Sequence, residues 1–350
     1  MAKISGIATA LPFNVVSQEA ARQVCERIHA GRPDLLRLLR IFSSSGVERR
    51  HFVFPLEYYA SGKSFDERNA DFIEQGVLLA ERAARASLER ARIGPDQVQH
   101  LIFATTTGLA TPSIDALLVR RLGLRNDIRR SPLFGLGCAG GAGALIRAQD
   151  VLRAYPKERA LVVALEICGQ VFSTRAVDRV DIVGASLFGD GAAAAVVSGD
   201  QTQGPSGPKI SATRSVLFSD TEDLMGWRFT SDGMRLRLSE RVTGFVRERL
   251  KPEVGSFLAE HSMPPERVDF WIMHPGGRRI LEAYRDVFSL GDQALKWTKT
   301  SLATVGNLSS ASVLFTLADV QACGNPREGD RGFMIALGPG FASEMLMLYW

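Results

Sequence analysis

A cysteine followed by a run of very small residues is the segment of this sequence best suited to chemistry. Residues 136–144 read Leu-Gly-Cys-Ala-Gly-Gly-Ala-Gly-Ala and follow an apolar, strand-like stretch. We expect Cys138 to lie where that strand ends and a helix begins. A helix N-terminus lowers the pKa of a thiol and favours its nucleophilic thiolate. An isolated cysteine is more often a small buried core residue, but this setting favours a nucleophile.

A histidine and an asparagine stand in comparable surroundings. His274 closes the apolar stretch Phe270–Met273 and precedes Pro-Gly-Gly, while Asn307 lies between Gly306 and Leu-Ser-Ser. Taken alone, His274 is equally well explained as a structural residue, and Asn307 as the N-cap of a helix. As a set, thiol, imidazole and carboxamide indicate acyl-thioester chemistry. The thiolate holds an acyl group, and the other two donate hydrogen bonds to oxygens that gain charge.

Other kinds of site are disfavoured by spacing. The four cysteines are Cys25, Cys138, Cys168 and Cys323, far apart and without a CxxC pair or a histidine at metal-ligand spacing. We therefore expect neither a metal site nor a disulfide framework. The glycine-rich run 137–143 is not a dinucleotide-binding loop, because a cysteine interrupts it and no acidic residue follows at the required distance. No cofactor is expected.

The elements that must position these residues form two successive α/β patterns. The first half predicts a helix over 69–95, a buried strand over 98–105, a helix over 111–122, a short strand over 131–137, a helix ending near 154, and strands over 159–165 and 191–197. The second half predicts helices over 242–261, 278–287 and 307–320, and strands over 268–273, 331–337 and 344–350.

The best boundary between the two halves is the stretch Gln201–Pro208, which is rich in Gly, Pro and Gln. We therefore expect a first half, residues 1–205, which carries the cysteine, and a second half, residues 206–350, which carries His274 and Asn307. A chain of 350 residues is long enough for two such units.

Composition indicates a soluble enzyme that handles small molecules. Hydrophobic residues make up 45% and charged residues 23%, and the formal charge of +4 comes from scattered arginines. A nucleic-acid-binding protein usually has a denser basic stripe, whereas a mild positive charge suits phosphorylated or carboxylated substrates. We see no secretion signal and no apolar run long enough to span a membrane, so we expect a cytoplasmic protein.

The motifs together resemble those of type III polyketide synthases, the chalcone and stilbene synthase family. The matching segments are Gly-Cys-Ala-Gly-Gly, His-Pro-Gly-Gly, Gly-Asn-Leu-Ser-Ser-Ala and Leu-Gly-Pro-Gly-Phe, with Thr-Thr-Thr-Gly at 105–108 followed by Pro112, and Leu-Phe-Gly-Asp-Gly at 187–191. The resemblance runs from about Lys3 to Trp350. It implies an α/β protein with the duplicated thiolase fold, five layers in the order αβαβα, and a homodimer.

The resemblance also implies site residues. Cys138 would take the acyl group from a CoA thioester, and His274 and Asn307 would act on the malonyl thioester. Phe188 matches a gatekeeper, Thr111 a residue that reaches the partner's pocket, and Gly276 belongs to the His-Pro-Gly-Gly motif. Cavity-lining positions fall on Thr106, Cys168, Gly184, Leu236 and Ser309. Arg37 and Arg40 match basic residues that hold CoA phosphates, although a third basic position is Ser44 here. Leu236 and Cys168 also depart from the plant enzymes.

The resemblance implies repeated decarboxylative condensation of malonyl-CoA onto an acyl-CoA starter, with CoA thioesters as substrates and no separate cofactor. We expect fatty acyl starters and alkylpyrone or alkylresorcinol products, because small side chains at Thr106, Cys168 and Gly184 leave room. The alternative is a ketoacyl-ACP synthase III, which performs a single condensation with the same trio. A thiolase is disfavoured because its second cysteine is missing after the Gly-Pro-Gly loop, and a non-catalytic subunit because all three residue types are present.

Overall fold

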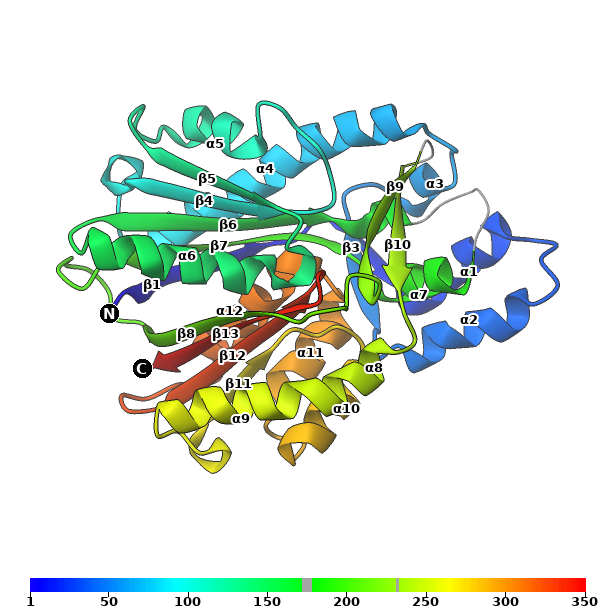
Figure 1. The fold of residues 1–350 in the computed structure, drawn as a ribbon. Coiled ribbons are helices and arrows are strands. Elements are labelled where there is room, and N and C mark those ends of the chain that lie inside the picture. The colour runs from blue at the N-terminus through cyan, green and yellow to red at the C-terminus, as the bar shows by residue number, and fades with distance from the viewer. Residues whose placement is uncertain (172–177, 231–232) are drawn as a thin grey trace.

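Strands and helices stack in five layers, helix–sheet–helix–sheet–helix (Figure 1). The structure is a computed structural model, and it describes residues 1–171, 178–230 and 233–350. Within these ranges, nine strands form one hydrogen-bonded order, β11-β12-β13-β8-β1-β7-β6-β4-β5. The ladder between β1 and β8 consists of one pair among the described residues, Lys3 with Lys209, so the nine strands fall into two half-sheets.

The first half-sheet is mixed, and its inner strands are deeply buried. β4 runs parallel to β5 and β6, whereas β7 runs antiparallel to β6 and β1. Every residue of β7 is buried, which explains its nearly unbroken apolar sequence, since both faces of this sheet are covered. Its strands in spatial order are β5 (Arg129–Phe134), β4 (His100–Thr105), β6 (Arg159–Ile167), β7 (Asp190–Ser198) and β1 (Lys3–Ala10).

The second half-sheet has a parallel pair, β11 with β12, and antiparallel neighbours on the other side. Its strands are β8 (Lys209–Leu217), β13 (Ala342–Tyr349), β12 (Arg331–Gly338) and β11 (Phe270–Met273). β11 ends immediately before His274, so the turn that follows it carries this residue at the edge of the sheet.

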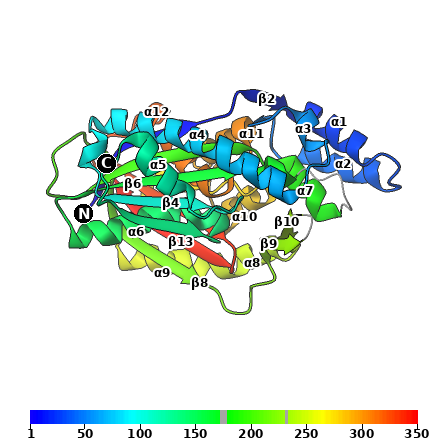
Figure 2. The same cartoon turned by 90° about the horizontal axis from the view of Figure 1, so that it is seen from above.

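Helices fill the middle layer and cover both outer faces (Figures 1 and 2). The middle layer consists of α6 (Gly140–Ala154) and α12 (Ser312–Cys323), whose small residues allow close packing: a Cβ on Gly141 would lie 2.2 Å from the backbone oxygen of Ser310. The outer layers contain α4 (Phe65–Ala91) and α5 (Ile114–Leu122) on one side, and α8 (Val242–Phe245), α9 (Lys251–Glu260) and α10 (Arg278–Phe288) on the other, with α11 (Lys296–Val305) beside α12.

A set of smaller elements gathers at one end of the layers, on the right of Figure 1. Both α2 and β10 pack against α7. The set comprises β2 (Asn14–Ser17), α1 (Gln18–Ile28), α2 (Leu35–Ser44), β3 (Arg49–Phe52), α3 (Leu56–Tyr59), α7 (Arg179–Leu187), β9 (Met225–Thr230) and β10 (Gly233–Leu238).

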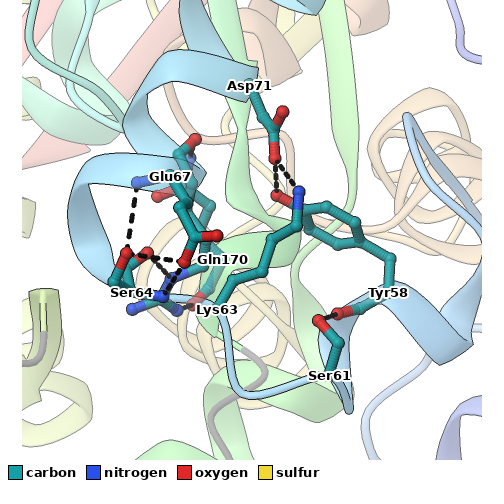
Figure 3. Close-up of polar contacts among 8 residues, drawn as sticks. Tyr58, Ser61, Lys63, Ser64, Glu67, Asp71 and Gln170 are labelled. Atoms are coloured by element: carbon teal, nitrogen blue, oxygen red, sulfur yellow. Dashed lines mark hydrogen bonds and ion pairs between the residues drawn. The ribbon is translucent and has the colours of Figure 1, made fainter.

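Polar contacts fix the start of α4 beside α3 (Figure 3). Ser64 caps α4, accepting a hydrogen bond from the backbone of Glu67, whose carboxylate accepts one from the Ser64 backbone. One turn further along, Asp71 accepts hydrogen bonds from the Tyr58 hydroxyl and, at 2.8 Å, from the Lys63 ammonium. Through these contacts the long helix that covers the first half-sheet is tied to the short helix at the end of the layers.

The elements expected from the sequence are present within a few residues of their predicted ends, with two clear differences. The helix expected to begin at 307 begins at Ser312, after a 3₁₀ turn at Ser309–Ala311. The helix expected over 242–261 contains a π-helical turn at Val246–Leu250 between α8 and α9. Pro252 follows that turn and has no N–H to donate to the preceding turn, which is a common cause of such irregularity. Within the described residues, no helix is both long and apolar enough to cross a membrane.

Candidate active site

A cavity of about 240 Å³ opens between the end elements and the layered core. Its lining includes Cys138, His274 and Asn307, which come from three separate places in the chain. All three are almost completely buried, with exposed fractions of 8%, 3% and 3%. The structure therefore brings together the three residues that the sequence singled out, at the junction of the two halves.

Cys138 lies in a short 3₁₀ turn, Gly137–Ala139, directly before α6. Gly137 has φ +50°, and a Cβ there would lie 2.5 Å from Cδ of Pro339 in the loop between β12 and β13. Only glycine fits this approach, because any side chain would collide with the proline ring. The close contact fixes the cysteine of the first half against a loop of the second.

The charge environment of Cys138 differs from the expectation that a helix N-terminus lowers its pKa. Burial dominates and raises the pKa of the thiol to about 12, and the negative charge of Glu166 acts in the same direction. Hydrogen bonds from Ser309 and Asn307 oppose this rise. The expectation of a lowered pKa was wrong for the free site. Removal of water destabilises the thiolate by more than the partial positive charge of the helix N-terminus stabilises it.

His274 is held by its backbone and leaves its ring available. Its backbone N–H donates to the carbonyl of Ile335 at 2.9 Å, which places it where β11 leaves the sheet. Its buried Nδ1 has no hydrogen-bond partner among the described residues. Burial lowers the pKa of His274 to about 3, so the imidazole is neutral at physiological pH.

Asn307 is oriented from both its backbone and its side chain. Its backbone N–H donates to Leu187 at 2.8 Å, and its Oδ1 accepts from the backbone of Ser309 at 2.8 Å and from the Ser312 hydroxyl at 3.4 Å. α12 begins only at Ser312. With the amide oxygen occupied, the NH₂ group is the end of Asn307 that remains for a ligand in the cavity.

A buried carboxylate next to this site was missed by the sequence analysis. Glu166 is fully buried, and its oxygens accept hydrogen bonds from the backbones of Thr106, Thr107 and Ser310 and from the hydroxyls of Thr107 and Ser310. Burial raises its pKa to about 7 despite these donors. A single carboxylate inside the apolar strand Arg159–Ile167 was the signal that could have revealed it.

The remaining residues of the sequence-based set occupy three kinds of position. Phe188, Leu236 and Gly276 line the cavity, and Ser44 does so at the end of α2. Thr106, Ser309, Cys168 and Gly184 are buried behind the lining: the Thr106 hydroxyl accepts from the backbone of Gly137 at 3.1 Å, and a Cβ on Gly184 would lie 3.3 Å from Leu236. Thr111, Arg37 and Arg40 are exposed and lie outside the lining.

Comparison with known proteins identifies the class to which this fold and site belong. The family model for the N-terminal domain of chalcone and stilbene synthases matches residues 1–201, and that for the C-terminal domain matches residues 209–349. The chain belongs to the chalcone and stilbene synthase family. Within that family it is a type III polyketide synthase of the bacterial kind, as its relatives show.

Two curated relatives match over almost the whole chain. A 1,3,6,8-tetrahydroxynaphthalene synthase of Streptomyces peucetius subsp. caesius is 39% identical, covering 99% of this chain and 93% of the relative. A putative chalcone synthase of Bacillus subtilis is 36% identical, covering 100% of this chain and 99% of the relative. These matches favour repeated malonyl-CoA condensation over the single condensation of a ketoacyl-ACP synthase III.

The solved structures agree with the fold expected from the sequence. The crystal structure of the tetrahydroxynaphthalene synthase of Streptomyces coelicolor A3(2), a bacterial type III polyketide synthase, superposes with a TM-score of 0.95 at 30% identity and covers 99% of each chain. The prediction of a duplicated, five-layer thiolase fold is confirmed. The family uses CoA thioesters and needs no further cofactor.

Proposed function

We propose that Cys138 is the nucleophile that carries the growing chain, and that His274 and Asn307 act on the malonyl thioester. The observation that carries this proposal is the lining of one cavity by all three side chains. Transfer of the starter forms a thioester at Sγ and releases CoA as the thiol. The thiol must lose its proton during loading, and His274 is the candidate base in the lining. Burial disfavours the thiolate and the imidazolium separately, but opposite charges that form together stabilise each other, and the proton then leaves with CoA as its thiol.

In the extension step, His274 and Asn307 act as neutral hydrogen-bond donors. Decarboxylation of malonyl-CoA releases CO₂ and leaves a carbanion whose charge is shared with the thioester oxygen. N–H groups of the neutral His274 ring and of the Asn307 amide stabilise that oxygen without placing a full positive charge in the buried site. The carbanion then attacks the acyl carbonyl on Cys138, the new carbon–carbon bond forms, and the cysteine leaves as a thiolate.

Roles in substrate entry and binding are proposed for residues according to where they lie relative to the cavity. Phe188 and Leu236 lie in the lining and Gly184 directly behind it, so these residues shape the space for the chain. Phe188 is proposed as the gate between the tunnel that admits CoA and the inner cavity. The walls around the inner cavity are proposed to include Gly276, Thr106, Ser309 and Cys168. Arg37 and Arg40 are proposed to hold CoA phosphates, since they project from the same helix as Ser44, which lines the cavity.

The starter is proposed to be a fatty acyl-CoA, and the apolar lining supports this. Val180, Val183, Met225, Leu238 and Ile280 all contribute to it, and apolar walls suit an alkyl chain. A second candidate is favoured by the name of the 39% identical relative, a tetrahydroxynaphthalene synthase. In that case malonyl-CoA alone would supply every carbon, because oxygens on alternate carbons are the pattern left by successive two-carbon units.

The assembly is proposed to be a homodimer in the cytoplasm, with halves 1–205 and 206–350. β5 ends the sheet, and five of its six residues are exposed, so its outer edge presents unpaired backbone groups of the kind that sheets usually cover. Phe134 at its end is 50% exposed. Thr111 is exposed as well, as a residue that contacts the partner's pocket requires.

The experiment that tests the function is incubation of purified protein with labelled malonyl-CoA and a panel of acyl-CoA starters, followed by mass spectrometry of products and protein. We expect products with two or more malonate-derived units and an acyl adduct on Cys138. Conversion of malonyl-CoA alone, with medium and long acyl-CoAs ignored, would replace the fatty acyl starter by the second candidate. A single extension seen only with carrier-protein thioesters would contradict the type III assignment.

A further inference from the structure

A fully buried arginine, Arg50 on β3, lies behind the cavity wall and is not part of the lining. Its Nη1 donates to the backbone carbonyls of Ala185 at 2.6 Å and Phe188 at 2.9 Å. Its Nη2 donates to the side chain of Gln18 at 2.7 Å. One guanidinium thus spans the end of α7 and the residue proposed as the gate.

Gln18 extends the same contacts to a second wall of the cavity. Its Nε2 lies within hydrogen-bond distance of the Ser186 carbonyl at 2.9 Å, the Phe42 carbonyl at 3.1 Å and the Ser45 hydroxyl at 2.7 Å. Phe42 belongs to α2, and Ser45 follows it. Ser45 and Ser186 both line the cavity, so the Arg50–Gln18 pair connects the C-terminal ends of the two helices that form its wall.

The aliphatic part of Arg50 also contacts the segment that carries Asn307. A Cβ on Gly306, whose φ is +75°, would lie 2.7 Å from the Leu187 carbonyl oxygen and 2.9 Å from Cγ of Arg50. The Asn307 backbone pairs with residues 187–189 through two hydrogen bonds of 2.8 and 3.1 Å. The segments 187–189 and 306–307 are therefore packed together against the arginine.

Electrostatics explain why a cation occupies this position. Burial lowers the pKa of Arg50 to about 9, and the nearby negative charge of Asp190 opposes that fall, so the guanidinium stays protonated at neutral pH. The carbonyls at the end of α7 carry the partial negative charge of a helix C-terminus, which also favours a cation. A neutral, apolar side chain of similar length would leave the Ala185 and Phe188 carbonyls without this donor.

We propose that Arg50 is a positioning residue for the condensation, which sets Phe188 and Asn307 relative to Cys138. The inference rests on the proposed function of those three residues. Arg50 touches no substrate; it acts by fixing the backbone on which the gate and the amide donor stand. Cys138 is carried by a different segment, the 3₁₀ turn before α6, and its contact with Ser309 does not involve Arg50. Arg50 therefore affects the reactivity of Cys138 toward a small reagent only through Asn307, whose hydrogen bond is the smaller of the two side-chain effects that lower the thiol pKa.

The test compares Arg50→Met, Arg50→Lys and Gln18→Leu with Arg49→Met, an exposed neighbour on the same strand. For each variant we measure kcat and KM for malonyl-CoA, product length, the melting temperature, and the rate at which iodoacetamide alkylates Cys138. We expect Arg50→Met to lower kcat by about 10- to 100-fold, as small misplacements of reacting groups do. Alkylation of Cys138 should slow by less than about threefold, far less than kcat falls, because the larger contribution of Ser309 to the thiol pKa is untouched. Arg50→Lys should recover part of the loss of kcat.

Two results would overturn the proposal. One is a folded Arg50→Met protein with the kcat, KM and product length of the wild type. The other is a fall of kcat that is matched by an equal fall of the alkylation rate and by a lowered melting temperature, which marks a purely structural role. If Arg50→Met does not fold, Gln18→Leu and Arg50→Lys decide: wild-type kcat in both refutes positioning, and a lowered kcat in folded protein supports it. Absence of extension by the wild type would instead refute the proposed function.

Discussion

The Sγ atom of Cys138 lies 3.7 Å from the Oγ atom of Ser309, and both are buried. The cysteine belongs to the first half of the chain and the serine to the second, two residues after Asn307. This contact is one of the few influences that lower the pKa of a thiol that burial raises to about 12. The Ser309 hydroxyl therefore makes ionisation of the Cys138 thiol easier.

Replacement of Ser309 by Ala tests that relationship. The thiolate loses a hydrogen bond, so the pKa of Cys138 rises further. We expect alkylation by iodoacetamide at neutral pH to slow by about tenfold, since a hydrogen bond to a charged group contributes about 1.5–3 kcal/mol. Peptide mass spectrometry measures the rate, with the exposed Cys323 as an internal control. An unchanged rate at Cys138 would show that the contact does not stabilise the thiolate.

Cys138→Ser should abolish condensation and leave the fold intact. The change in volume is small, and the site already contains hydroxyl groups, so the melting temperature should stay close to that of the wild type. Product formation from labelled malonyl-CoA is the measurement. Cys323→Ser, at an exposed position, is the matched control and should keep activity. Full activity of Cys138→Ser would eliminate the cysteine as nucleophile.

His274→Gln should slow extension more than it slows acyl loading. The neutral imidazole is proposed to donate to the oxygen that gains charge during decarboxylation, and loss of one such donor typically costs about 10²–10³-fold in rate. Single-turnover measurements separate the two steps: adduct formation on Cys138 reports loading, and CO₂ release from malonyl-CoA reports decarboxylation. Equal losses in both steps would contradict the assignment of His274 to the malonyl thioester.

Glu166→Gln should destabilise the protein, because an NH₂ group would face donors that now point at a carboxylate oxygen. We expect the free energy of unfolding to fall by about 1–3 kcal/mol, measured by urea denaturation. The control is Glu89→Gln, which makes the same chemical change at an exposed position of α4. No loss of stability in Glu166→Gln would mean that the buried donors find other acceptors.

The free energy of unfolding of the wild type should depend on pH through Glu166, because the pKa of this residue is about 7 in the folded protein against an ordinary 4.5. Between those values the folded state binds more protons than the unfolded state, so this group's stabilising contribution is present below pH 4.5 and is lost as pH rises toward 7. Asp190 and His274 titrate in overlapping ranges. The difference between wild type and Glu166→Gln isolates the Glu166 contribution, and a flat difference would refute it.

Gly184→Val should shorten the products. A Cβ at this position lies 3.3 Å from Leu236 and 3.5 Å from Phe188, so a branched side chain must push into the space for the growing chain. Mass spectrometry of the products measures the change. Gly255→Val is a matched control, since Gly255 is also helical and a Cβ there meets nothing within 4 Å. Products of unchanged length would show that the chain does not pass this wall.

The helices, the strands and the three candidate catalytic residues could be predicted from the sequence, because each depends on a pattern among neighbouring residues. β6 and β7 were visible because strands covered on both faces consist almost entirely of apolar and small residues, and α10 because its buried residues recur at helical spacing. The trio was visible because each member lies among small residues at the end of an element. The division into layers followed from the alternation of strands and helices in both halves.

What the sequence did not reveal depends on contacts between distant segments. The high pKa of Cys138 results from burial that only the assembled cavity creates. Glu166 and Arg50 were missed because nothing in their neighbouring residues indicates Ser310, 144 positions away, or Phe188, 138 positions away. Such long-range polar contacts have no short-range signature in one sequence.

The single Lys3–Lys209 pairing between β1 and β8 has a consequence for how this enzyme gains and keeps its activity. The halves share little continuous sheet, yet the proposed nucleophile comes from one and both donors from the other. Neither half alone contains a complete reaction centre, and the core between the two sheets is also shared, with Leu145 of one half and Leu314 of the other in the same buried cluster. Turnover thus requires the two halves to be docked, and substitutions in the core that they share should lower activity and stability together.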